Sequence, residues 1–196
     1  MFWGAIRLLL HSNSDALKRL DRIREDFSVL MAQELEAMWA KKIGLTSDDP
    51  DLIGELIQLM CSSSLDYTIF FRALSHIPQH FSSLGQCFYR PCAEQVQARW
   101  ERWLQRWHHR IMQSGEPSSL AVAMKQVNPK YTWREWLIAP AYQQAEQGGN
   151  SLINELQLNL RHPYDEQSME MQARYDRLKP REFFSAGGIS HYSCSS

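Results

Sequence analysis

Apolar residues recur every three or four positions through most of the chain, which is the spacing of one face of an α-helix. The longest such run extends from Asp15 to Ile43, and Gly44 follows it as a helix stop. The apolar positions of this run share one helical face: Leu17, Leu20, Ile23, Phe27, Leu30, Met31, Leu35, Met38 and Trp39. The pattern therefore predicts a long amphipathic helix over this range.

Further helices follow at the same spacing, separated by glycine, proline and serine residues. Asp66 is placed to cap one of them, Thr132 is placed to cap another, and Pro140 predicts a kink in that second helix. No stretch of alternating apolar and polar residues is long enough to predict a strand. The predicted fold class is therefore all-α, with these helices after the first: 50–62, 66–74, 91–111, 120–127, 132–147 and 151–160.

The end of the chain differs in kind from the rest. Pro163, Pro180 and Gly187-Gly188 punctuate it, and apart from a short turn around 168–175 it has no helical stripe. We therefore predict a helical domain over residues 15–162 and an extended tail over residues 163–196. Residues 1–14 form a separate short segment before the domain.

Composition and charge exclude several classes of function. The 196 residues are 44% hydrophobic, which is enough for one sizeable core, and 21 Lys and Arg against 22 Asp and Glu give a net charge of −1. This balance provides no global basic field, which argues against nucleic acid or an anionic membrane as a partner. No apolar run approaches the roughly 18 residues of a membrane helix. Four cysteines without paired spacing predict a cytoplasmic protein.

Common catalytic and binding motifs are absent from the sequence. It contains no G-x-G-x-x-G or G-x-x-x-x-G-K phosphate loop, no H-E-x-x-H, no C-x-x-C and no G-x-S-x-G. His76, His80, Cys87 and Cys92 fit no common zinc spacing, and Pro78 interrupts the helix that would align the two histidines. We therefore predict no catalytic, cofactor-binding or metal-binding residue in this chain.

The predicted helix over 91–112 carries tryptophans and arginines together. Trp100, Trp103 and Trp107 form one stripe. The arginines beside it are Arg99, Arg102, Arg106 and Arg110. Such a mixture can stack bases and bind phosphates, as single-strand binders do. At neutral overall charge we favour a buried tryptophan face and a solvated arginine face, and a docking face for a partner protein remains open because it would use the same residues.

The carboxylates late in the chain give a weaker signal. Those in Pro163–Glu166 and at Glu155, Asp176 and Glu182 could pair for acid–base work, but such pairs need a cleft and perturbed pKa values. We expect surface or capping roles for them. Cys61 ends an apolar helical stripe, and we expect its thiol to be protected from solvent.

Cys194 is informative through its position. It lies near the end of the chain among serines, where no core packing accounts for a thiol. Either it is incidental or its reactivity matters, because an exposed thiol can reach a partner cysteine by disulfide exchange. We expect Cys194 to be the most accessible cysteine, Cys87 and Cys92 to be intermediate, and Cys61 to be the least accessible.

A set of stretches in a fixed order points to a known family. The internal ones are Lys42-Ile43-Gly44-Leu45, Asp66 to Leu74, Asn128-Pro129-Lys130-Tyr131 with Arg134, and Pro163 to Gln167. In this order they resemble motifs in the C-terminal part of selenoprotein O proteins. The segment from Leu178 to Cys194 is similar to the family's tail, with Cys194 where selenium-containing members have selenocysteine. Met1 to Leu10 more weakly resembles a helix of the kinase-like C-lobe.

The resemblance implies a kinase-like (pseudokinase) protein that binds ATP with Mg²⁺ or Mn²⁺ and transfers AMP to Ser, Thr or Tyr hydroxyls of protein substrates. The family's nucleotide-binding and metal-binding residues do not map onto this sequence, which implies a C-terminal fragment that is inactive alone. The resemblance makes Cys194 the redox residue and the kinase-like domain of the family the partner. The alternative is an independent helical interaction module that uses the helix over 91–112.

Overall fold

The structure, a computed structural model, describes residues 2–184 of the 196. Within this range the chain is mostly helical and has no strand, only an isolated antiparallel bridge between Leu65 and Phe88. The prediction of a helical fold is confirmed, and none of the described helices is both long and apolar enough to cross a membrane. In chain order the helices are α1 (Phe2–Leu9), α2 (Ser14–Lys42), α3 (Pro50–Ser62), α4 (Tyr67–Leu74), η1 (Phe81–Cys87), α5 (Glu94–Ser114), α6 (Pro117–Val127), α7 (Glu135–Glu146), α8 (Ser151–Leu160), α9 (Met169–Tyr175) and η2 (Arg181–Phe184), where η denotes a 3₁₀ helix.

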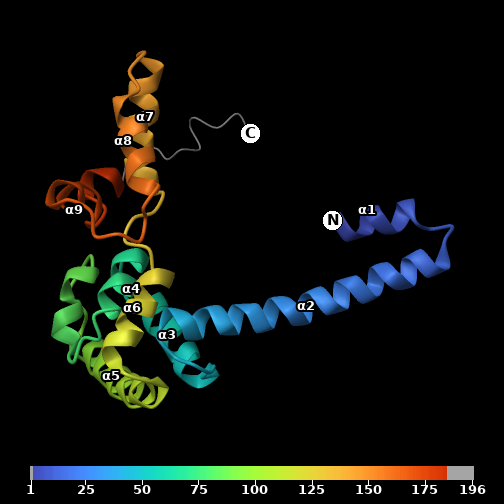
Figure 1. Cartoon of the computed structure of the whole chain (residues 1–196), viewed down its shortest axis with the longest axis horizontal. Coiled ribbons are helices and arrows are strands. Elements are labelled where there is room, and N and C mark those ends of the chain that lie inside the picture. The colour runs from blue at the N-terminus through green and yellow to red at the C-terminus, as the bar shows by residue number, and fades with distance from the viewer. Residues whose placement is uncertain (1, 185–196) are drawn as a thin grey trace.

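The body of the molecule is built around α5, whose tryptophans lie in the larger of two apolar clusters (Figure 1). Trp100, Trp103 and Trp107 are fully buried, and α3, α6 and η1 pack against α5. Each of these three indole N–H groups donates to an acceptor on another part of the chain, which satisfies a buried donor. The acceptors are Ser63 Oγ at 3.1 Å, Leu52 O at 2.9 Å and Ile43 O at 2.8 Å. The predicted buried tryptophan face is confirmed.

A smaller apolar cluster lies where α7 and α8 pack together, in the part that projects from the body beside α9 (Figure 1). Its buried members are Tyr131, Ala141, Leu156 and Tyr175. Gly148 turns the chain between the two helices with a φ of 83°, a left-handed conformation that favours glycine. The two apolar clusters have no member in common.

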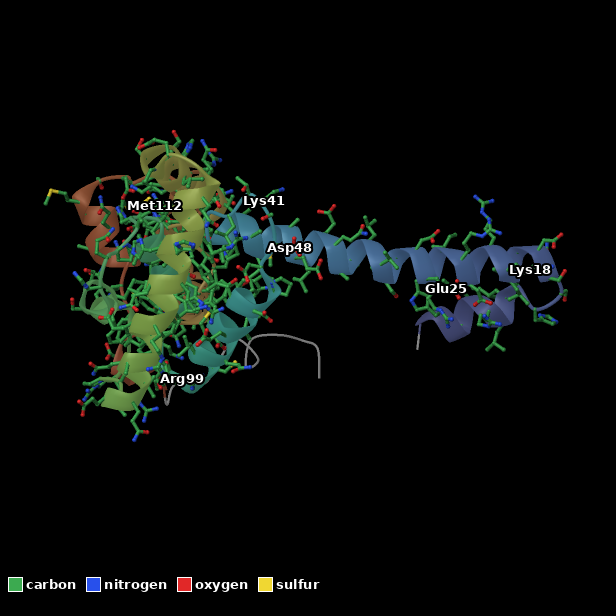
Figure 2. The ribbon with its side chains drawn as sticks, turned by 90° about the horizontal axis from the view of Figure 1, so that it is seen from below. Lys18, Glu25, Lys41, Asp48, Arg99 and Met112 are labelled. Atoms are coloured by element: carbon green, nitrogen blue, oxygen red, sulfur yellow. The ribbon has the colours of Figure 1, made fainter. Side chains whose placement is uncertain are left out.

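α2 extends away from the body over most of its 29 residues, and only its C-terminal end joins the core (Figures 1 and 2). Every residue from 22 to 36 is exposed. In both views α1 lies alongside the N-terminal part of α2, where Arg7 forms an ion pair with Asp21. The helix is amphipathic as predicted, but within residues 2–184 nothing covers most of its apolar side.

The start of α7 differs from the prediction. The helix begins at Glu135, and the side chain of the N-cap residue Arg134 makes no capping hydrogen bond. The expected cap at Thr132 is therefore wrong. The backbone N–H groups of Lys130 and Tyr131 both donate to the Pro163 carbonyl, at 2.8 and 3.1 Å. This tertiary contact holds the chain extended where capping chemistry alone would allow a helix to start.

Residues 163–184 belong to the segment that the sequence sets apart as a tail. In the structure they contain α9 and η2, and Tyr175 of α9 is buried in the smaller cluster. The division of the chain at residues 14 and 162 stays a prediction. The rest of the tail, with Cys194, lies outside the described residues.

Candidate functional site

Polar side chains gather between the two apolar clusters. We call this group the polar junction, and its members are Lys42, Asp66, Arg72, Asn128, Lys130, Arg134 and Glu166. They come from the end of α2, from α4 and its N-cap, from the connection between α6 and α7, and from the segment after α8. Buried polar groups are costly unless they are hydrogen-bonded, so their partners determine what the junction can do.

Arg72 is the centre of the polar junction. Its buried guanidinium projects from α4, and Nη1 donates to the carbonyl oxygens of Lys125 and Asn128, both at 3.1 Å. Nη2 donates to the Tyr164 carbonyl at 3.0 Å and to Glu166 Oε1 at 2.7 Å. A single side chain therefore binds the end of α6 and the segment after α8 to α4.

Glu166 is held between two cations. Lys130 Nζ donates to its Oε2 at 2.6 Å, while Arg72 holds Oε1. Burial tends to raise the pKa of Glu166, but the hydrogen bonds and charges of Lys130 and Arg72 outweigh it and lower that pKa to about 2. Lys130 also donates to Gln172 at 2.9 Å and lies 3.5 Å from Asp176, whose pKa is raised by burial. The Glu166 carboxylate is thus ionised at neutral pH and already bound on both oxygens.

Asp66 and Arg134 form a further ion pair of the junction. Nη1 and Nη2 of Arg134 donate to the two carboxylate oxygens of Asp66, at 2.8 and 3.1 Å. The same carboxylate caps α4 by accepting from the Ile69 N–H at 3.0 Å, and it accepts from the Tyr89 hydroxyl at 2.9 Å. Bidentate pairs of this kind are among the stronger charge-assisted hydrogen bonds. This pair ties the start of α7 to the start of α4.

Asn128 joins the end of α2 to α4. Its Nδ2 donates to the Lys42 carbonyl at 2.8 Å and to Ser75 Oγ at 3.2 Å, while its Oδ1 accepts from Lys42 Nζ at 2.8 Å. The Lys42 ammonium also lies 4.3 Å from the centre of the Phe71 ring, a cation–π contact. Burial lowers the pKa of Lys42.

The polar junction is a network of ion pairs and hydrogen bonds that holds elements of the fold together. Its carboxylates, Asp66 and Glu166, are bound by arginine and lysine side chains. Within residues 2–184 there is no group of three His, Cys, Asp or Glu side chains that could hold a metal ion. Neither the divalent metal nor the ATP of the family resemblance fits these residues, because their charged groups already bind one another.

Sequence reasoning missed the polar junction. It expected surface or capping roles for the late carboxylates, and Glu182 is indeed exposed. Glu166 is exposed as well, but both Glu166 and the half-buried Asp176 lie against Lys130, which sequence reasoning did not expect. The signal for the junction was the family resemblance, since each of its internal stretches contributes a side chain. Spacing along the chain alone does not reveal it, because the members come from four separate parts of the fold.

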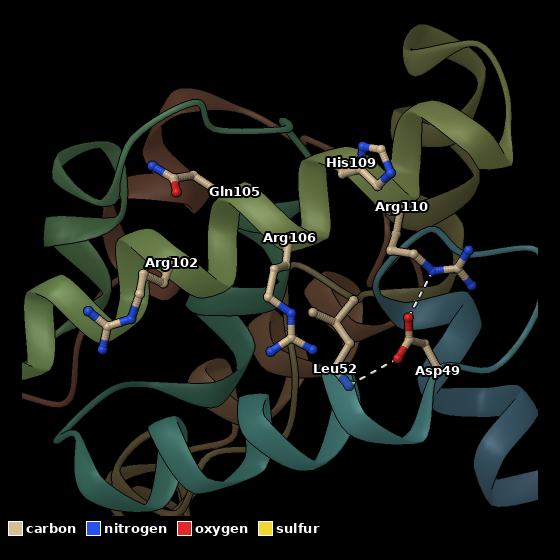
Figure 3. A pocket seen from close by; sticks show the side chains of 7 residues that line it. All are labelled: Asp49, Leu52, Arg102, Gln105, Arg106, His109 and Arg110. Carbon is tan, nitrogen blue, oxygen red and sulfur yellow. Dashed lines mark hydrogen bonds and ion pairs between the residues drawn. The ribbon is translucent and has the colours of Figure 1, made fainter.

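The arginine side of α5 lines a cavity of about 510 Å³ against the start of α3 (Figure 3). Arg110 Nε donates to Asp49 Oδ2 at 2.8 Å, and Asp49 also caps α3 by accepting from the Leu52 N–H at 3.1 Å. Arg106 forms an ion pair with Glu55 of α3. These arginines are already paired with α3, which leaves them little charge for binding phosphates.

The accessibility of the cysteines differs from the expected order. Cys61 is exposed, Cys92 is half-buried and Cys87 is buried, and burial raises the pKa of Cys87 to about 12. The expected protection of Cys61 is therefore wrong. Met60 before it is half-buried against the core, but Cys61 lies one helical step further round α3, on its solvent side. Cys194 lies outside the described residues, so its redox role stays a prediction.

Acidification is expected to weaken the polar junction through Glu166. Because the pKa of Glu166 falls from 4.5 to about 2 on folding, its contribution to stability is present above about pH 4.5 and is lost as the pH falls towards 2. Since half of the side chain is exposed, we expect a loss of only about 1 kcal/mol. Urea unfolding between these pH values should show it in the native chain and not in Glu166→Gln. Glu25→Gln, at an exposed position of α2, serves as the control, and an equal acid response in both variants would contradict the prediction.

Comparison with known proteins identifies the family of this chain. Residues 3–161 match the family described as "Protein adenylyltransferase SelO". The "Protein nucleotidyltransferase YdiU" of Tolumonas auensis is 35% identical over 182 residues, covering 88% of this chain and 34% of the relative. The protein of the same name from Thioalkalivibrio sulfidiphilus is 37% identical over 183 residues, covering 90% and 36%.

The chain therefore belongs to the SelO family of protein nucleotidyltransferases. It is also 32% identical over 197 residues to the protein nucleotidyltransferase YdiU of Vibrio parahaemolyticus, covering 96% of this chain and 39% of the relative. The chain thus spans little more than a third of the length of the curated relatives it matches.

Proposed function

We propose that this chain is the helical C-terminal part of a SelO-family protein adenylyltransferase, and that it acts together with a kinase-like domain that it does not itself contain. In this proposal the kinase-like domain binds ATP with Mg²⁺ or Mn²⁺ and transfers AMP to Ser, Thr or Tyr hydroxyls of cytoplasmic protein substrates. The chain described here supplies structure and no catalytic residue. Its membership of the family and its span of about a third of the relatives support this division of labour.

The apolar face of α2 is the observation that carries the proposal. It consists of residues that are 36 to 54% exposed: Ile23, Phe27, Leu30, Met31, Leu35 and Met38. At 100° per residue these positions lie on one side of a helix that is about 43 Å long. A helix with such a stripe gains most of its stability from packing, and a large exposed apolar patch marks an interaction surface. The proposed occupant is the kinase-like domain, because this chain matches only about a third of the length of its relatives. The other two thirds of those proteins are available to cover the face.

Docking on this face is testable with a matched pair of variants. The triple variant Phe27→Gln, Leu30→Gln, Met31→Gln removes the centre of the stripe, whereas Val29→Gln changes an equally exposed apolar residue on the opposite side of α2. The chain alone should bind a hydrophobic dye and self-associate. We expect the triple variant to reduce dye binding at least threefold and Val29→Gln to leave it nearly unchanged, because burial of apolar area drives both effects.

The partner arm uses the remaining two thirds of the Tolumonas auensis relative. Size-exclusion chromatography of the mixture should give a complex that the triple variant loses, and labelled AMP should reach protein only when both parts are present. The proposal fails if the mixture gives no complex and the triple variant binds the dye as well as the native chain does.

The alternative, an independent interaction module on the helix over 91–112, has less support. Trp100, Trp103 and Trp107 are buried within the core, and Arg106 and Arg110 are paired with α3. The redox role of Cys194, with a partner cysteine in the kinase-like domain, belongs to the main proposal.

A further inference from the structure

A cavity of about 740 Å³ lies between the chain after η1 and the segment that leads into η2. Its volume falls within the range of small-molecule sites, roughly 300–1,000 Å³. The cavity shares no lining residue with the polar junction or with the cavity of Figure 3. It adjoins the polar junction, because Tyr89 of its lining donates to Asp66 and Arg134 donates to the Arg177 carbonyl, but its lining residues are different.

The lining of this cavity is strongly cationic. Arg90, Arg177, Lys179 and Arg181 all line it, and no Asp or Glu does. None of the four forms an ion pair with a residue in the described part of the chain. Arg90 donates to the neutral hydroxyl of Ser64 at 2.8 Å, and Arg177 donates to the Arg174 carbonyl at 3.2 Å while its guanidinium lies 5.2 Å from the centre of the Trp136 ring. Arginines elsewhere in the fold, at positions 72, 106, 110, 134 and 174, have carboxylate partners, whereas Arg99 and Arg102 on α5 also form no ion pair within residues 2–184. Like charges gathered without counter-charge favour the binding of an anion.

An aromatic and aliphatic wall stands beside these cations. The Tyr89 and Phe184 rings meet edge to face with centres 5.4 Å apart, and Lys179 Nζ lies 5.0 Å from the centre of the Phe184 ring. Leu178 and Pro180 extend the wall. A ligand that joins an anionic group to a planar or apolar group would satisfy both parts of the cavity.

A phosphate is the anion that suits these cations best. The N–H groups of an arginine guanidinium match the oxygens of a phosphate in geometry. A phosphate monoester carries nearly two negative charges at neutral pH and so neutralises several cations better than one carboxylate does.

We propose that the cavity is a binding site for a small phosphate monoester, with the phosphate among Arg90, Arg177, Lys179 and Arg181 and its planar or apolar group against Phe184. The site is independent of the function proposed above, because it uses neither α2 nor a kinase-like domain. It needs no metal ion, since the cations of the chain provide the counter-charge.

Calorimetry on the full chain with simple probes tests the assignment. Phenyl phosphate should bind saturably with a Kd below about 1 mM at low salt, and inorganic phosphate should bind at least fivefold more weakly because it lacks the ring. Phenol, which lacks the charge, should give no measurable binding. Raising the salt concentration to about 0.5 M should weaken phenyl phosphate at least fivefold, because exposed charges are then screened.

Three single variants separate this site from general charge effects. Arg90→Ala and Arg181→Ala, both at exposed positions, should each weaken phenyl phosphate about tenfold. Arg102→Ala removes an equally exposed arginine from the other cavity and should leave binding unchanged. Far-UV circular dichroism checks that each variant is folded, and Arg181→Lys should retain part of the affinity.

Several results would overturn the proposal. They are the absence of phenyl phosphate binding, equal binding of phenol, equal binding of inorganic phosphate, or an equal loss in Arg102→Ala. A phosphotyrosine peptide that binds at least tenfold more tightly than phenyl phosphate would also overturn it, because the contacts beyond the ring would assign the site to a protein partner.

Discussion

Replacing Arg72 by alanine is expected to lower the free energy of unfolding by about 3 kcal/mol or more. The change removes four hydrogen bonds at once and leaves the carbonyl oxygens of Lys125, Asn128 and Tyr164 without this donor. It also leaves Glu166 with Lys130 at 2.6 Å and the more distant Lys125 at 3.7 Å as its cationic partners. Urea unfolding followed by far-UV circular dichroism measures the loss.

The helices that lose amide protection show whether Arg72 joins the two apolar clusters or only adds to the stability of the whole chain. In Arg72→Ala we expect amide hydrogen exchange to rise first in α7, α8 and α9, while the amides of α3 and α5 stay protected. Arg106→Ala is the matched control, because it also breaks an arginine–glutamate pair but at an exposed position, and it should cost less than about 1 kcal/mol. Equal costs for the two variants, or uniform exchange, would contradict the role of Arg72.

Replacing Trp103 by alanine is expected to cost about 4 kcal/mol, the other large effect in this chain. Its fully buried ring stacks on Trp107 with centres 5.9 Å apart and an angle of 7° between the planes. Its Nε1–H donates to the Leu52 carbonyl at 2.9 Å, which joins α5 to the first turn of α3. The substitution leaves a large cavity and a buried carbonyl without its donor.

A series of substitutions at position 103 separates the contribution of the buried ring from that of the Nε1–H hydrogen bond. Trp103→Phe keeps much of the ring but loses the N–H, so we expect it to cost about half as much as alanine. Trp133→Ala is the control, because Trp133 is 63% exposed, and it should change stability by less than about 0.5 kcal/mol. If Trp103→Ala were as mild as Trp133→Ala, the tryptophan stripe would not be the centre of the core.

The local elements could be predicted because their signals are local. Asp66 caps α4 as expected, since a carboxylate and the backbone N–H three residues later lie within one turn. The helix over 151–160 appears at the predicted residues. Gly44, expected as a stop, has a φ of 74°, and Met124 packs so closely that a Cβ there would meet it. For residues this near in sequence, the spacing along the chain determines how they lie relative to one another.

The candidate site could not be predicted in the same way. Arg72 binds groups 53 to 94 residues further along the chain, and nothing in its neighbourhood distinguishes it from an arginine on a solvated face. The cationic cavity likewise combines Arg90 with Arg177, Lys179 and Arg181, which come together only after the chain has passed through five further helices.

By itself the sequence determined that this protein is helical, where most of its helices lie and which family it resembles, because periodicity, capping and ordered motifs are properties of the chain. Tertiary structure alone decided which apolar faces are covered. The stripes of α2 and α5 have the same spacing, yet Trp103 is buried and Phe27 is half exposed. The physical reason is that spacing fixes the side of a helix on which residues lie, whereas burial depends on the element that packs against that side.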